Sequence, residues 1–172
     1  LTAAEVVSDE GGIAIAAGRD LTLASAEETH HFEQDTVRKK SGFLSSKTTT
    51  THDETTATYA IGTTLSGETV DLAAGNDLLL QAATVAGTGD VSLVAGNDIT
   101  IQTAQNTVTE AHSSHTKKSG LFGTGGIGFT IGKQTRENTA DIKEQTHTGS
   151  LIGSTDGRVD IVAGGDVAIA GS

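Results

Sequence analysis

A four-residue motif, Ala-Gly-x-Asp, constrains the fold of this chain more than any other feature of its sequence. Its four copies are Ala17-Gly18-Arg19-Asp20, Ala74-Gly75-Asn76-Asp77, Ala95-Gly96-Asn97-Asp98 and Ala163-Gly164-Gly165-Asp166. Short segments of alternating apolar and polar residues lie on both sides of each copy, which is the pattern of half-buried strands joined by a tight turn. Internal repetition of such units is typical of a solenoid.

The spacing of the copies predicts the kind of solenoid. The two middle copies lie 21 residues apart, which suits one rung of a β-helix whose rungs stack about 4.8 Å apart. Leu72 and Leu93 are then expected to be neighbours in a shared apolar interior. We expect the glycine to adopt a positive φ at the turn and the aspartate to bond to a turn amide. Asn76 and Asn97 are expected to stack as a ladder.

A longer repeat encloses the short one and divides the chain. Residues 11–44 align without gaps with residues 89–122, with 11 identities in 34 positions that include Lys39-Lys40-Ser41-Gly42 and its copy Lys117-Lys118-Ser119-Gly120. The sequence therefore predicts one all-β domain over 1–172, a right-handed parallel β-helix with four to five rungs. Rungs are expected over about 1–26, 59–104 and 151–172, and two polar excursions over about 27–58 and 105–150.

The excursions differ from the rungs in composition. They hold all six histidines, all four phenylalanines and nine of the 11 lysines and arginines, whereas the rungs carry a net charge of −10. Lys47–Tyr59 is rich in threonine, and Ile127, Phe129 and Ile131 alternate with small residues, which favours strands. Each excursion is expected to be a long β-hairpin that folds back through the Ser-Gly of Lys-Lys-Ser-Gly. A disordered loop is the competing interpretation.

The rungs, with Ala-Gly-Asn-Asp followed by alternating apolar residues, resemble the haemagglutinin repeats of filamentous haemagglutinin and its relatives. The Lys-Lys-Ser-Gly excursion followed by a glycine-rich apolar stretch resembles more specifically the second haemagglutinin-repeat region of CdiA, the contact-dependent growth inhibition family. The resemblance covers essentially the whole chain. It implies a right-handed β-helix, export by an outer-membrane two-partner-secretion transporter, and display on the surface of a Gram-negative bacterium. In that family this region is thought to help a C-terminal toxin cross the outer membrane of a target cell.

Composition agrees with this resemblance. The chain lacks cysteine and methionine. Without cysteine, no premature disulfide can form during threading through an outer-membrane pore, and without a starting methionine we expect the chain to be part of a longer polypeptide. The net charge of −11 argues against nucleic acid as a partner.

The excursions hold the candidate contact residues. The pairs Lys39-Lys40 and Lys117-Lys118 could bind lipid head groups or lipopolysaccharide phosphate, and the alternating apolar run beyond them could enter a membrane. The candidate membrane or partner contacts are Lys39, Lys40, Lys117, Lys118, Phe122, Ile127, Phe129 and Ile131. The alternative is that the lysines only keep hairpin ends soluble and unable to pair edge to edge.

Other motifs are interpreted as structural. Gly123-x-Gly125-x-x-Gly128 matches a dinucleotide fingerprint but lacks the strand–helix context that such a site needs. The histidines, among them His30, His31, His112 and His115, are interpreted as solvated loop residues rather than zinc ligands. The aspartate of each rung is interpreted as a turn residue rather than a catalytic acid or a calcium ligand.

We therefore expect no catalytic residue, no metal and no cofactor. The first hypothesis is a toxin-delivery segment of a contact-dependent inhibition exoprotein, with the target-cell outer membrane or its components as a partner. The alternative is a passive β-helical stalk or adhesin segment that binds host or bacterial surfaces. A carbohydrate-active β-helix is the third hypothesis.

Overall fold

The computed structural model describes residues 1–123 and 129–171. Within these residues the secondary structure is β-strand, and no helix is present that could span a membrane. The chain forms two compact units. The β-helix unit comprises Leu1–Glu28, Thr58–Asn106 and Gln145–Ser172, and the hairpin unit comprises Thr29–Ala57 and Thr107–Glu144.

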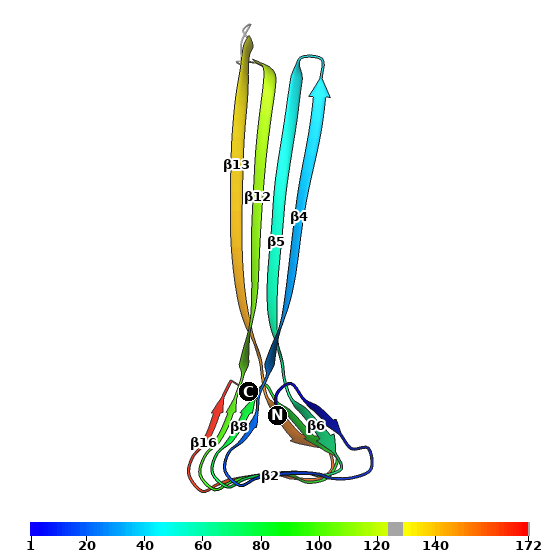
Figure 1. The fold of residues 1–172 in the computed structure, drawn as a ribbon, viewed down its shortest axis with the longest axis vertical. Helices are drawn as coiled ribbons and strands as arrows, with labels where there is room; N and C mark the ends of the chain where they lie inside the picture. The colour runs from blue at the N-terminus through cyan, green and yellow to red at the C-terminus, as the bar shows by residue number, and fades with distance from the viewer. Residues whose placement is uncertain (124–128, 172) are drawn as a thin grey trace. The chain divides into compact units, whose positions relative to one another are not determined.

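The β-helix unit is built from four rungs of three strands each, coiled around a common interior (Figure 1). The rungs, in chain order, are β1 (Glu5–Val7), β2 (Ile13–Ala17) and β3 (Leu21–Leu23); β6 (Thr64–Gly67), β7 (Val70–Ala74) and β8 (Leu78–Gln81); β9 (Thr84–Gly87), β10 (Val91–Ala95) and β11 (Ile99–Gln102); and β14 (Leu151–Ser154), β15 (Val159–Ala163) and β16 (Val167–Ala170). The predicted all-β parallel helix is confirmed.

Strands at equivalent places in successive rungs form three parallel sheets, with the orders β1-β6-β9-β14, β2-β7-β10-β15 and β3-β8-β11-β16. The register places like residues above one another. Val91 pairs with Val70 and Leu93 with Leu72. Because side chains alternate between the faces of a strand, this register sends every second residue of each rung into the same interior.

The interior is the hydrophobic core. Leu72 is 1% exposed and Leu93 is fully buried, so the expectation that these two residues are buried neighbours is confirmed. Burial fades at the last rung, where Ile169 is 58% exposed. A hollow of about 250 Å³ lies there, lined by apolar residues that include Ile101 and Ile161.

The glycine of the repeated motif is needed for close packing rather than for an unusual backbone conformation. None of its four copies has a positive φ, so that prediction is wrong. A β-carbon on Gly96 would instead lie 2.2 Å from the carbonyl oxygen of Gly75, and one on Gly75 would lie 2.4 Å from that of Gly18. The turns of successive rungs stack so tightly that only a hydrogen atom fits between them.

The aspartate and asparagine of the motif tie each turn to the next. The Asp77 carboxylate accepts hydrogen bonds from the Asn97 side chain at 2.8 Å and from the backbone amide of Asp98 at 3.2 Å. Asp20 accepts the corresponding bonds from Asn76 and Asp77, and the bond from Asn76 is the main reason that the pKa of Asp20 is lowered. The predicted asparagine ladder is therefore a mixed ladder of asparagine and aspartate.

The hairpin unit contains most of four longer strands, β4 (Ala26–Gly42), β5 (Ser45–Ile61), β12 (Ala104–Gly123) and β13 (Phe129–Thr148). The predicted β-hairpins are present (Figure 1). Their predicted reversal point is wrong, because Lys-Lys-Ser-Gly continues the strand in both copies. The first chain reversal occurs one step later, at a two-residue turn formed by Phe43 and Leu44.

Candidate functional site

The two hairpins form one sheet. The strand order is β13-β12-β5-β4, so β5 of the first hairpin pairs with β12 of the second. The amide of Leu121 donates to the carbonyl of Leu44 at 3.3 Å, and the hydroxyls of Ser46 and Ser119 lie 2.8 Å apart. Two segments more than 60 residues apart in sequence are thereby held side by side.

This sheet has almost no core of its own. Among the described residues of the hairpin unit, Ala57 is the only buried side chain. Threonine and charged residues cover both faces, and threonine is a strong strand former that tolerates exposure. The sheet is therefore held by backbone pairing and cross-strand side-chain contacts, and both of its faces are free for other contacts.

Charge is unevenly distributed along the sheet. Residues 37–51 and 111–136 contain no aspartate or glutamate. We call the cationic residues of these two segments the basic end: Arg38, Lys39, Lys40, Lys47, Lys117, Lys118, Lys133 and Arg136. All 22 acidic residues and only three of the 11 basic residues lie elsewhere in the chain. A cationic surface of this kind attracts anions even though the whole chain is acidic.

Three lysines of the basic end lie in one row across three strands. His52 on β5 is bonded to Asp35 on β4, and continuing this antiparallel register places Lys40 opposite Lys47. The pairing of β5 with β12 through Ser46–Ser119 likewise places Lys47 opposite Lys118. Because alternation puts opposed residues on the same face, these three residues form what we call the lysine row.

A second row lies beside the lysine row on the same face. The hydroxyls of Thr49 and Thr116 lie 3.4 Å apart, and an arginine flanks them on each side. Arg38 and Thr49 line one shallow groove of about 230 Å³ together with Lys40 and Lys47. Thr116 and Arg136 line another of about 220 Å³ together with Lys47, Lys118 and Gln134. Lys47 is shared by both grooves.

The opposite face carries fewer and more dispersed cations. One hollow is lined mainly by residues of this face, namely Lys117, Lys133, Ser46, Thr48, Ser119 and Thr135, but Lys118 and Gln134, which also line a groove of the lysine-row face, reach it as well. By strand alternation Lys39 belongs to this face as well. Thr48, rather than a lysine, separates Lys39 from Lys117 in their row, so like charges are not directly opposed there.

Large apolar side chains accompany the basic end. Phe43 and Leu44 form the turn of the first hairpin and are 99% and 58% exposed. Ile131 on β13 is 78% exposed. A fully exposed phenylalanine at a turn gives the fold nothing through burial, because it remains in water.

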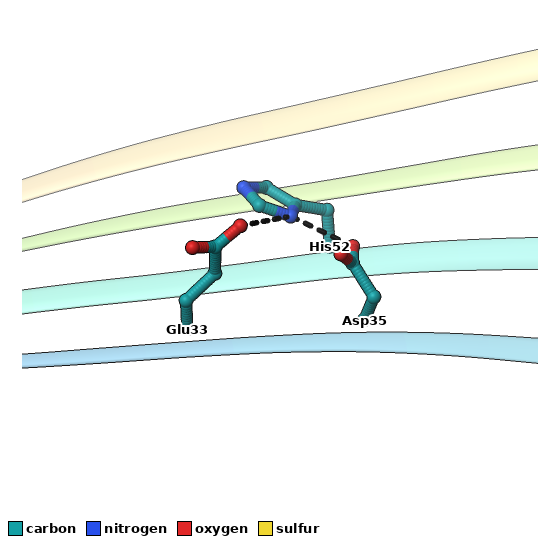
Figure 2. Close-up of side chains that lie close together, drawn as sticks. All are labelled: Glu33, Asp35 and His52. Atoms are coloured by element: carbon teal, nitrogen blue, oxygen red, sulfur yellow. Dashed lines mark hydrogen bonds and ion pairs between the residues drawn. The ribbon is translucent and has the colours of Figure 1, made fainter.

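A second cluster, of histidine and carboxylates, lies on β4 and β5 (Figure 2). Nδ1 of His52 is 2.8 Å from an Asp35 carboxylate oxygen and 3.8 Å from one of Glu33. Glu54 approaches the other ring nitrogen at 4.0 Å. The hydrogen bond to Asp35 is the main cause that raises the pKa of His52, and the charges of the three carboxylates add to it.

This cluster satisfies the distance requirement for a metal site. One donor atom each from Glu33, Asp35 and His52 lies within 4.8 Å of the others. All three side chains are substantially exposed, and a protonated His52 between carboxylates is a sufficient reason for the arrangement. We therefore treat the cluster as a set of pH-sensitive cross-strand contacts.

The other histidines with a described partner also lie on strands, not in loops. His112 on β12 bonds to Asp53 on β5, which is another contact between the two hairpins. Nδ1 of His31 lies 3.1 Å from the Thr56 hydroxyl. The prediction that the histidines are loop residues is wrong, because the excursions are strands over these positions.

The predicted contact residues fall in four groups. Lys40 and Lys118 belong to the lysine row, whereas Lys39 and Lys117 belong to the opposite face. Ile131 is described and exposed. Ile127 lies outside the described residues, as do the side chains of Phe122 and Phe129, and most of the Gly123–Gly128 motif.

Sequence reasoning missed several residues at this end. Lys47 occupies the centre of the lysine row, and Arg38 and Arg136 complete the grooves. Part of the evidence for these residues is in the sequence, because the absence of acidic residues from both segments can be seen there. The pairing of β5 with β12, which brings the two segments together, cannot.

Comparisons with known proteins agree on one family. The family described as Hemagglutinin repeat matches residues 41–172. A 16S rRNA endonuclease CdiA of Enterobacter cloacae subsp. cloacae is 47% identical over 93% of the chain. A tRNA nuclease CdiA of Escherichia coli strain STEC_O31 is 44% identical over 98% of the chain, and a deoxyribonuclease CdiA of Dickeya dadantii is 44% identical over 93%. The chain spans about 5% of the length of each of these relatives. No solved structure matches it.

Proposed function

The chain belongs to the hemagglutinin-repeat family, and from this premise we propose that it is a structural and translocation segment of a large secreted CdiA-like exoprotein. The exoprotein is exported by an outer-membrane two-partner-secretion transporter and displayed on the surface of a Gram-negative cell. The segment aids delivery of a toxin carried elsewhere in that protein into target bacteria.

The observation that carries the proposal is similarity to CdiA proteins with different toxic activities. Relatives named for a 16S rRNA endonuclease, a tRNA nuclease and a deoxyribonuclease all contain a region similar to this chain. A segment shared by proteins with different nucleic-acid substrates supplies something that they have in common. Each of these toxins has to reach its target cell, whereas the substrates on which they act differ.

We propose that the segment itself is not an enzyme. Its grooves at the basic end are lined by lysine, arginine, threonine and glutamine, without the pairing of acid and base that hydrolysis needs. The aspartates of the rungs bond to asparagine side chains and backbone amides, so stacking the rungs already gives them a role.

Contact with the target cell is assigned to the hairpin unit. The proposed contact residues are Lys39, Lys40, Lys117, Lys118, Phe122, Ile127, Phe129 and Ile131. Exposed cations and apolar side chains at one end of a sheet support this assignment, since that combination favours a membrane interface.

Replacing each of residues 29–57 and 107–144 by a short glycine–serine turn in the full-length exoprotein tests the proposal. We expect surface display, measured with an antibody to the exoprotein, to persist because the β-helix core is untouched. Killing of target cells in co-culture is expected to fall to the level of an exoprotein without its toxin. Unchanged killing at equal display would support the alternative, a passive stalk or adhesin.

A further inference from the structure

The lysine row is unfavourable for the fold. Like charges directly opposite one another on a sheet destabilise it, and here Lys47 faces a lysine on each side. No acidic residue lies in the neighbouring segments, and none of the three lysines forms an ion pair within the described part of the chain. Within the described residues no carboxylate pairs with these exposed lysines, so an anion bound from outside would relieve the repulsion.

The neighbouring row indicates which anion fits. Arg38 and Arg136 flank two threonine hydroxyls beside the lysines. Arginine binds phosphate through two parallel hydrogen bonds, and lysine binds it as a point charge. Adjacent strands lie about 4.8 Å apart, so the two rows offer closely spaced donors to more than one phosphate group.

The apolar turn indicates where that phosphate is found. Phe43 and Leu44 lie three and four residues beyond Lys40 in the sequence and protrude into solvent. A soluble polyanion gives exposed phenylalanine and leucine no apolar surface to enter. A lipid surface does, because its phosphate groups lie directly above the acyl chains.

We infer that the face formed by Arg38, Lys40, Lys47, Lys118 and Arg136 binds the phosphate groups of an anionic lipid surface, with Phe43 and Leu44 inserted between the head groups. The inference rests on the proposed function, since delivery to a target cell is what would bring this face to a membrane. It adds lipid phosphate as the ligand, and it adds Arg38, Lys47, Arg136 and the apolar turn to the contact residues proposed above.

Co-sedimentation of the 172-residue chain with vesicles tests this site directly. The three vesicle types are phosphatidylcholine alone, phosphatidylcholine with phosphatidylglycerol, and phosphatidylcholine with lipid A, whose phosphomonoesters carry more charge per group. We expect affinity to rise in that order and to fall at high salt, where charges are screened beyond about 3 Å at 1 M. Equal binding to all three vesicle types would overturn the inference.

A pair of matched triple variants separates the site from general attraction. Lys40→Gln, Lys47→Gln and Lys118→Gln together remove the lysine row, and each basic residue near an anionic surface is worth about fivefold in affinity. We expect the triple variant to bind lipid A vesicles about 100-fold more weakly. The control, Arg19→Gln with Lys133→Gln and Lys143→Gln, removes the same charge outside this face and outside the contact residues proposed above, and should lose less than about tenfold. Equal losses would overturn the assignment to this face.

A third set of measurements identifies the source of the phosphate. Phe43→Ser with Leu44→Ser should weaken vesicle binding about tenfold or more while leaving binding of inorganic polyphosphate unchanged. If the serine variant binds vesicles as well as the parent does, or if polyphosphate or single-stranded DNA binds more tightly than lipid A vesicles, a lipid surface is not the ligand. Circular dichroism of each variant checks folding, and removal of the lysine row should not lower the melting temperature.

Failure of this inference is distinguishable from failure of the proposed function. If the lysine-row variant binds vesicles normally while hairpin replacement abolishes killing, the lipid site is wrong and the delivery role stands. If lipid binding behaves as expected while hairpin replacement leaves killing unchanged, the delivery role is wrong and the inference loses the premise on which it rests.

Discussion

The β-helix unit and the hairpin unit consist of the same kind of secondary structure but are stabilised in different ways. In the β-helix, inward residues such as Leu93 and Ile99 are fully buried, and every rung repeats the register of the one below it. In the hairpin sheet, both faces are exposed and cross-strand pairs such as His52–Asp35 supply the contacts. Burial of apolar side chains stabilises the β-helix unit, whereas contacts between side chains on neighbouring strands stabilise the hairpin unit.

The two units also treat charge differently. The motif aspartates Asp20, Asp77 and Asp98 accept hydrogen bonds from the next turn, so these acidic residues contribute to stacking. The lysine row has no such partner within the described residues, and Lys47 at its centre faces a lysine on each side. The carboxylates used for folding accept hydrogen bonds from neutral groups of the next turn, whereas the opposed lysines of the row are available for a ligand.

Truncating a core residue should produce the largest contrast between the units. Leu93→Ala leaves a cavity between rungs, and such changes cost about 2–5 kcal/mol. Val37→Ala on β4 removes apolar atoms that are already more than half exposed, so its effect should stay within about 0.5 kcal/mol. Urea unfolding followed by far-ultraviolet circular dichroism measures both. Equal effects would mean that the rungs do not enclose a common core.

The stacked turns provide a contrast within the β-helix itself. Gly96→Ala places a β-carbon 2.2 Å from the carbonyl oxygen of Gly75, and relief of that overlap should cost about 3 kcal/mol. Gly153→Ala on β14 meets nothing within 4 Å and should stabilise by about 0.5 kcal/mol, because alanine loses less backbone entropy than glycine. A melting temperature that falls for both variants would contradict this account of the glycine column.

The sequence was informative where structure repeats. The Ala-Gly-x-Asp spacing determines the rung, and alternation identifies the inward residues, because one rung's register is copied by the next. The role of the glycine was mispredicted, since a turn glycine with positive φ and a glycine in close backbone contact look alike in sequence. The sheet joined by β5 and β12 was missed, because threonine-rich strands exposed on both faces carry no hydrophobic pattern that sets their partner or register.

The candidate site was also only partly predictable from the sequence. Lys40 and Lys118 were found because they belong to a repeated motif, but the motif assigns them no more weight than Lys39 and Lys117. Only the pairing of β4, β5 and β12 shows that the first two share a face with Lys47. Side-chain alternation then separates the two members of each lysine pair.

The aspartate ladder should respond to substitution less than the core does. Asp77→Ala removes the acceptor used by Asn97 and by the amide of Asp98. Because these groups are exposed or only partly buried and water can replace the carboxylate, we expect a loss of about 1–2 kcal/mol. Asp77→Asn keeps an acceptor and should recover part of that loss. Urea unfolding measures both variants, and a ladder without structural importance would leave both midpoints unchanged.

The smallest expected effect is a pH response confined to the hairpin sheet. The pKa of His52 is raised above 6.5 in the folded sheet, so its protonated form stabilises the sheet fully below pH 6.5, and this contribution is lost as the pH rises through the folded pKa. Amide hydrogen exchange of β4 and β5, corrected for the intrinsic rate, should therefore show stronger protection at the lower pH.

His52→Gln should abolish the difference in protection between the two pH values, whereas His115→Gln, at a histidine without a described partner, should preserve it. Because the rungs contain no histidine, amides of β7 and β10 should show no step in this pH range. An equal step in both units would mean that the response belongs to the whole chain and not to the Asp35–His52 contact.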